Sequence, residues 1–148
     1  MLDAITSLLG DFDLSKFIPD IETALGRFEL TARIFVMLGP LVLLGLGLWY
    51  LLAPPKEMGS RVGFHTFRRA QTQEIWDYTQ RLAGIVWGAM GTALTLIMAL
   101  ICNGYRGMNA LQVATSAVIC IFIELILLTA SIIAINVIVT KAFYKNDN

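Results

Sequence analysis

Apolar residues fall into three long blocks, over residues 31–53, 82–102 and 111–139. They contain about 23, 21 and 29 residues, and a helix of about 20 apolar residues crosses the ~30 Å hydrocarbon core of a bilayer. The third block exceeds that length, so its helix must tilt or protrude. The pattern therefore predicts three transmembrane helices.

Residues 1–28 follow a different pattern, in which apolar residues recur at helical spacing and the polar positions are mostly acidic. The apolar positions are Leu2, Ile5, Leu9, Phe12, Leu14, Phe17, Ile18, Ile21, Leu25 and Phe28. This predicts an amphipathic helical region that lies at the membrane interface or caps the bundle, although a partner-docking helix has the same pattern. The chain is thus expected to be an all-α integral membrane protein with an interfacial region, 1–28, and a three-span membrane domain, 29–148.

Proline and aromatic residues mark features of the first block. Pro40 lies inside it and is expected to kink the helix. Pro54 and Pro55 should end it, because neither continues a helix. Trp49 and Tyr50 lie near this end, where amphipathic rings anchor at lipid headgroups.

Residues 54–81 form the longest polar segment between apolar blocks. The segment holds the only histidine and five of the eleven basic residues, Lys56, Arg61, Arg68, Arg69 and Arg81. Thr72 is a suitable N-cap, with Glu74 in the first turn of the helix that follows. We expect a structured loop and a juxtamembrane helix that continues into the second span.

Basic residues also predict the orientation, because short cytoplasmic loops are enriched in Lys and Arg. With three spans, the 54–81 loop and the C-terminal tail share one side, which also carries Lys141 and Lys145. The other side carries Lys16, Arg27, Arg33 and Arg106, together with most of the acidic residues. The N-terminus is therefore expected outside, with the loop and C-terminus in the cytoplasm of a multi-pass cell-membrane protein.

A set of short motifs runs through this loop into the second span. In order they are Pro54-Pro55, Gly63-Phe64-His65-Thr66, Glu74 with Trp76, Arg81, and Ala83-Gly84. The order and spacing resemble the SdpI-type immunity protein family, whose members carry a proline-rich span end, a G-[FY]-R-T-P signature and an E-x-W segment before a small-residue-rich span. The chain departs from this pattern at His65, where arginine is usual, and at Phe67, where proline is usual.

The resemblance implies a small bacterial membrane protein that protects its cell from a secreted, membrane-active peptide toxin. Some members of the family also hold a cytoplasmic repressor at the membrane. The residues that the resemblance assigns to the signature loop are Gly63, Phe64, His65, Thr66, Glu74, Trp76, Arg81 and Gly84.

Glu124 is the strongest isolated signal outside the loop, because a carboxyl group inside an apolar block is costly and marks a candidate functional site. Thr92 and Thr95 of the second span are its candidate hydrogen-bond partners. One interpretation is proton or cation handling. The other is a neutral, hydrogen-bonded glutamic acid that fixes helix packing, which we favour because a lone carboxyl is a poor proton relay.

Several function classes are not supported by the sequence. No nucleophile–base pair, metal constellation or phosphate-binding loop can be assembled, so we expect neither an enzyme nor a cofactor. Cys102 and Cys120 lie in or beside apolar blocks and are expected to be buried, unpaired side chains. The net charge of zero gives no field for nucleic acid. Two alternatives to toxin immunity remain: a structural subunit of a larger membrane complex, and an ion- or proton-conducting homo-oligomer around Glu124.

Overall fold

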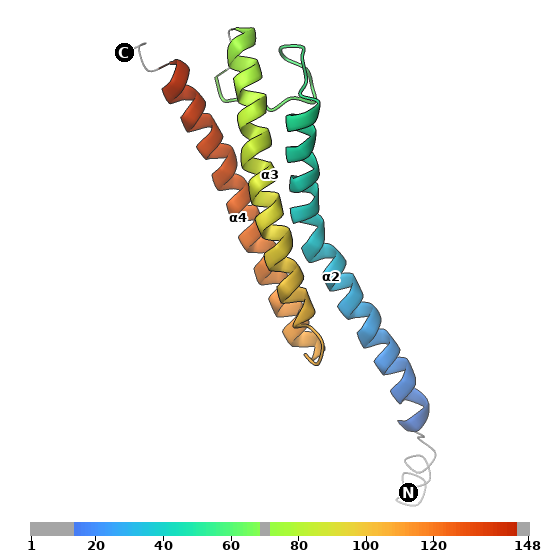
Figure 1. Cartoon of the computed structure of the whole chain (residues 1–148). Helices are drawn as coiled ribbons and strands as arrows, with labels where there is room; N and C mark the ends of the chain where they lie inside the picture. The colour runs from blue at the N-terminus through green and yellow to red at the C-terminus, as the bar shows by residue number, and fades with distance from the viewer. Residues whose placement is uncertain (1–13, 69–71, 145–148) are drawn as a thin grey trace, which may run out of the picture.

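The computed structural model describes residues 14–68 and 72–144, which form three long α-helices and no strand. The helices are α2 (Leu14–Leu52), α3 (Gln73–Asn103) and α4 (Ala110–Phe143). Each is long and apolar enough to cross a membrane. They run up, down and up, so the α2–α3 loop and the C-terminal end of α4 lie at one end of the molecule (Figure 1). The expected all-α architecture with three membrane-length helices is confirmed.

The helix boundaries follow from local sequence. α2 ends at Leu52, just before Pro54 and Pro55. The Thr72 side chain caps α3 by accepting a hydrogen bond from the Ile75 N–H, as expected. α3 therefore begins nine residues before the second apolar block and continues unbroken through it. At the other end, Asn109 and Gln112 form a capping box that starts α4.

The N-terminal region is continuous with the first span in the part that the structure describes. α2 runs without a break from Leu14, and its apolar, membrane-length part is Gly26–Leu52. Residues 1–13 lie outside the described residues, and the interfacial role of 1–28 stays a prediction. Along its length α2 bends, and its N-terminal half leans away from the other helices (Figure 1). Pro40 accounts for a bend, because it lacks the N–H that would bond one turn back.

Glycines allow α2 and α3 to approach closely. A Cβ added to Gly47 of α2 would collide with the backbone of Gly88 and Trp87 in α3. In the same way, a Cβ on Gly91 would collide with the backbone of Leu44. Van der Waals packing drives helix association in lipid, where small residues let backbones meet. These two helices thus form the tightest contact that the structure describes.

Gly47→Ala should therefore separate α2 from α3. The neighbouring atoms are backbone, which cannot move aside as a flexible side chain would, so we expect a loss of about 1 to 3 kcal/mol of stability. Thermal unfolding in detergent micelles would measure it. Gly45→Ala is the matched control, because nothing lies within 4 Å of an added Cβ there. Equal melting temperatures for the two variants would contradict the close approach.

One face of α4 packs on the other helices. Its buried residues are Val113, Ala117, Cys120, Glu124, Ser131, Ile135, Asn136 and Val139. Most recur every three or four positions, as one helix face requires. Its other faces expose large apolar side chains, as expected for a helix that contacts lipid. Cys102 and Cys120 are both buried and free, which confirms the sequence-based expectation.

Candidate functional site

The α2–α3 loop, residues 53–72, is fastened to α3 by several hydrogen bonds, of which the two made by the Gln80 side-chain amide are buried. Gln80 is fully buried. Its Oε1 accepts a hydrogen bond from the Phe64 N–H at 2.8 Å, and its Nε2 donates to the Phe64 carbonyl at 2.9 Å. Both polar groups of one peptide residue are thereby satisfied without a strand or helix, which allows this backbone to be buried.

Three aromatic rings, those of Phe64, Trp87 and Tyr50, contact one another in series. The Phe64 ring meets Trp87 of α3 edge to face, with centroids 5.3 Å apart, and Trp87 stacks on Tyr50 of α2 at 5.7 Å. The Tyr50 hydroxyl donates to the Val62 carbonyl at 2.8 Å, which ties the loop to α2. Tyr50 is buried, so its expected role as a headgroup anchor is wrong, whereas its neighbour Trp49 is exposed. The ring of Tyr50 is used to pack the loop instead.

Trp76 supports the outer part of the loop. Its Nε1–H donates to the Pro55 carbonyl at 2.7 Å, and its ring lies so close to Gly63 that a Cβ there would collide with it. The His65 ring meets the Trp76 ring edge to face at 5.5 Å. The glycine is therefore required by the indole beneath it, since any side chain at this position would push the loop outward.

α4 completes the attachment of the loop. The Phe67 N–H donates to the Asn136 side chain at 2.7 Å. The Trp87 indole donates to Ser131 at 3.1 Å, and the Arg68 guanidinium lies 5.4 Å from the centre of the Tyr144 ring. The loop thus contacts all three helices at one end of the bundle.

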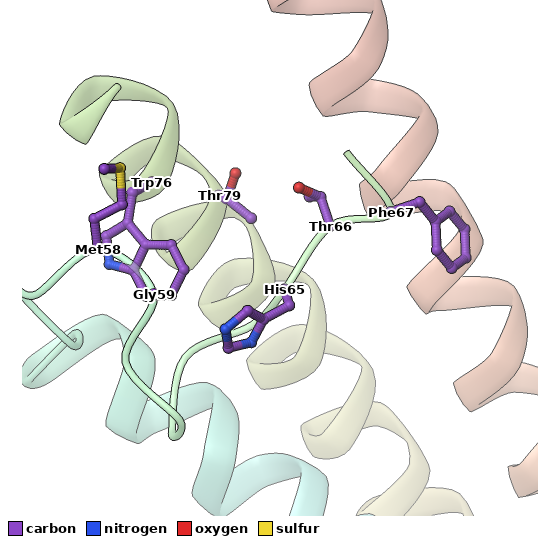
Figure 2. Close-up of a pocket in the computed structure, with 7 residues that line it drawn as sticks. All are labelled: Met58, Gly59, His65, Thr66, Phe67, Trp76 and Thr79. Atoms are coloured by element: carbon purple, nitrogen blue, oxygen red, sulfur yellow. The ribbon is translucent and has the colours of Figure 1, made fainter. Parts of the chain in front are cut away.

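A cavity of about 490 Å³ opens between the loop and α3. Its lining residues are Met58, Gly59, His65, Thr66, Phe67, Trp76 and Thr79. Met58 and Gly59 lie beside Trp76, whereas the ring of Phe67 points away towards α4 (Figure 2). The lining mixes an indole, an imidazole and two hydroxyl groups, which suits a partly apolar ligand with polar atoms.

The described residues offer no metal centre. Within residues 14–68 and 72–144, no three His, Cys, Asp or Glu side chains lie close enough together to hold a metal ion. The groups that the cavity does present are aromatic rings and hydroxyls, which can contact a ligand and form hydrogen bonds with it.

Residues 56–138, more than half of the chain, match the family model described as the SdpI/YfhL protein family. The chain belongs to the SdpI/YfhL protein family. The resemblance read from the loop motifs is thereby confirmed, and with the three apolar helices it makes the chain a multi-pass membrane protein. No curated protein and no solved structure matches the chain.

The signature residues of this SdpI/YfhL protein occupy three kinds of place. Phe64 and Trp76 are buried under the loop, and Gly63, which directly precedes Phe64, lies against the Trp76 ring. His65 and Thr66 line the cavity, and the Thr66 hydroxyl donates to the Arg68 carbonyl.

The remaining signature residues lie on α3. Glu74, in its first turn, and Arg81 are exposed. Gly84 is buried against Leu51 of α2, so its place is in the helix contact rather than in the loop. The signature is thus partly a loop-folding motif and partly a helix-packing motif.

Sequence reasoning missed three residues that hold the SdpI/YfhL loop: Gln80, Ser131 and Asn136. Each is a buried polar residue in or beside an apolar block, which is a signal of a structural or functional partner in a membrane protein. Ser131 also lies seven residues after Glu124, so both are on one helix face. Their partners could not be read from sequence because the contacts join residues 16 to 69 positions apart.

The expected partners of Glu124 are wrong. The hydroxyls of Thr92 and Thr95 donate to the carbonyls of Gly88 and Gly91, one turn back on their own helix. Glu124 is buried, and its Oε1 has no hydrogen-bond partner among the described residues. A threonine hydroxyl in a membrane helix is satisfied by its own backbone, so it is not free to meet a carboxyl on another helix.

Proposed function

We propose that this protein is an immunity protein that protects its cell from a membrane-active peptide. Membership of the SdpI/YfhL family supports a function of this kind. The observation that carries the proposal is the pairing of Gln80 with both backbone groups of Phe64, which holds the family's signature loop in one conformation over α3. A binding surface that is already ordered loses less conformational entropy when its ligand arrives.

The mechanism that we propose is sequestration of the peptide at the loop end of the bundle. A side chain of the peptide would enter the 490 Å³ cavity and contact the Trp76 ring, while a donor group on it bonds to the Thr66 hydroxyl oxygen, whose own proton is donated to the Arg68 carbonyl. Arg61 and Arg68 are exposed on the same loop and would attract anionic lipid headgroups, at about 1 kcal/mol per residue. The cavity would thereby stay at the membrane surface, where the peptide must pass.

The orientation that fits this role places the loop end in the cytoplasm. The loop and the C-terminal part of α4 lie at one end of the molecule (Figure 1), so the basic residues of both are on the same side of the membrane. An excess of Lys and Arg on one side supports a cytoplasmic location for it. The peptide would then be captured once it has entered the bilayer and reached its cytoplasmic face.

Gly63→Leu should abolish protection while leaving the protein in the membrane. The new side chain would meet the Trp76 ring and push the loop away from the cavity. Bacteria that carry Gly63→Leu, the control variant Gly45→Leu or the unchanged chain would be exposed to secreted hydrophobic peptides. A voltage-sensitive dye would report whether each strain keeps its membrane potential. Gly45→Leu is the control, because that glycine is exposed and has no neighbour within 4 Å. Full protection by Gly63→Leu would contradict the proposal.

A second role, docking of a cytoplasmic regulator, is favoured by the outer surface of the loop. Phe67 is 80% exposed, and about half of the Met58 and Val62 surfaces are exposed as well. Apolar side chains beside the basic residues of a short loop form a surface that a partner protein could cover. Stoichiometric co-purification with a soluble protein would support this role, and its loss in Phe67→Ser would locate the contact.

A further inference from the structure

A second, separate cavity lies between α2 and α4, away from the loop. Its volume is about 380 Å³. Its walls are formed by Phe35, Leu38, Gly39, Val42, Leu43, Leu46, Trp87, Ile121, Glu124, Leu125 and Leu128. Ten of these eleven residues are apolar or glycine, so Glu124 supplies the only ionisable group in the lining.

The carboxyl group of Glu124 is left without a donor in this cavity. The residue is only 7% exposed, and its Oε1 has no partner among the described residues. Its Oε2 lies against Gly39, where an added Cβ would collide with it. Arg33, on the same helix as Gly39, forms its ion pair with Glu29 instead. A buried acceptor without a donor is costly, which calls for a ligand that supplies one.

The depth of this carboxyl group restricts what the ligand can be. Glu124 lies near the middle of α4, and Gly39 lies at the middle of the apolar part of α2, Gly26–Leu52. Both are therefore near the centre of the bilayer, about 15 Å from either headgroup layer. A lipid headgroup cannot bring a donor to this depth, so a small ligand that supplies the donor has to dissolve in hydrocarbon.

We propose that this cavity is a binding site for a small apolar amine that enters from the bilayer. The amine nitrogen would donate to Glu124 Oε1, and its hydrocarbon body would contact the leucine and phenylalanine walls. Phe35, Leu38 and Leu125 are more than half exposed on the outer surface of the helices, which opens the cavity towards lipid. The volume falls in the range of roughly 300–1,000 Å³ of small-molecule sites, and the apolar walls with one polar anchor are typical of them.

The test is binding of tritiated 1-aminoadamantane to the full chain in phosphatidylcholine nanodiscs, with empty nanodiscs subtracted. We expect saturable binding that unlabelled 1-aminoadamantane displaces and adamantane, which lacks the nitrogen, does not. Glu124→Gln should weaken the affinity about tenfold or more, because it replaces a charge-assisted bond with a neutral one. Gly39→Ala should also weaken it, since the new methyl group would displace the carboxyl group, whereas Gly45→Ala should bind normally.

Each outcome decides the proposal. Gly39→Ala keeps the glutamate, so it tests the site even where Glu124→Gln fails to elute as a folded species from size exclusion. Binding that does not saturate, equal displacement by adamantane, or unchanged affinity in both variants would overturn the proposal and indicate a cleft that only lipid chains fill. Cross-linking of α2 to α4 between two copies, with no amine binding, would overturn it in favour of a second copy of the chain.

Discussion

Trp87→Ala should destabilise the protein by about 3 kcal/mol or more and loosen the loop from the bundle. The indole of Trp87 contacts α2, the loop and α4 together, through Tyr50, Phe64 and Ser131. Removing it leaves a void between groups that cannot all collapse inward, because α2 and α3 are already in backbone contact. Thermal unfolding in micelles would measure the loss.

Two further variants separate the contributions of this ring. Trp49→Ala removes an indole of the same size that is nearly half exposed, so it should cost little. Trp87→Phe keeps one aromatic ring but removes the hydrogen bond to Ser131 and part of the buried volume, so an intermediate loss is expected. A melting temperature for Trp87→Ala as high as that of Trp49→Ala would show that the ring does not hold the loop.

Gln80→Leu should release the loop and abolish toxin protection, even though it makes the site more apolar. Leucine has a similar size, but it leaves the N–H and the carbonyl of Phe64 without partners in a buried place. Each unsatisfied group costs about 1 to 3 kcal/mol, and the loop can recover this only by moving into water. Trypsin, which cuts after Lys56, Arg61 and Arg68, should then cleave the loop faster.

A graded response would tie this effect to the hydrogen bonds. As an ionised carboxylate, Gln80→Glu can still accept from the Phe64 N–H but cannot donate to its carbonyl, so its cleavage rate should fall between those of Gln80→Leu and the unchanged chain. Ile85→Ala, one to two turns further along α3 at an exposed apolar position, should leave cleavage unchanged. If Gln80→Leu resists trypsin as well as the unchanged chain does, the paired amide is not what fastens the loop.

The three helices were predictable from the apolar blocks of membrane length. Inside a bilayer the backbone N–H and C=O groups must bond to one another, and a single segment achieves this as an α-helix. Thr72 and the Pro54–Pro55 pair marked the helix ends for local reasons, and the structure agrees at both places. The continuity of α2 through residues 14–28 was not predictable in this way. Amphipathic spacing indicates a helix face, but it does not say whether that helix is separate from the span after it.

The site was predictable in its residues and not in its connections. Gly63, Phe64 and Trp76 were identified as a signature, but nothing in their spacing shows that Gln80 bonds to the Phe64 backbone. The expected pairing of Glu124 with threonines failed for a related reason. Hydrogen bonds between helices depend on the rotation and depth of each helix, and these are set by packing rather than by the local sequence.

The distances in sequence between the loop and its partners set an order for assembly during synthesis. Pro55 and Phe64 bond to α3 residues that follow them by 21 and 16 positions. Phe67 bonds to Asn136 of α4, which follows it by 69 positions. Because chains emerge from the ribosome N-terminus first, the loop would be captured by α3 while α4 is still being translated. The hydrogen bond from the Phe67 N–H to Asn136 of α4 would then form last. Nascent chains that stop short of residue 136 should therefore carry a loop that is folded on α3 but not yet bonded to α4.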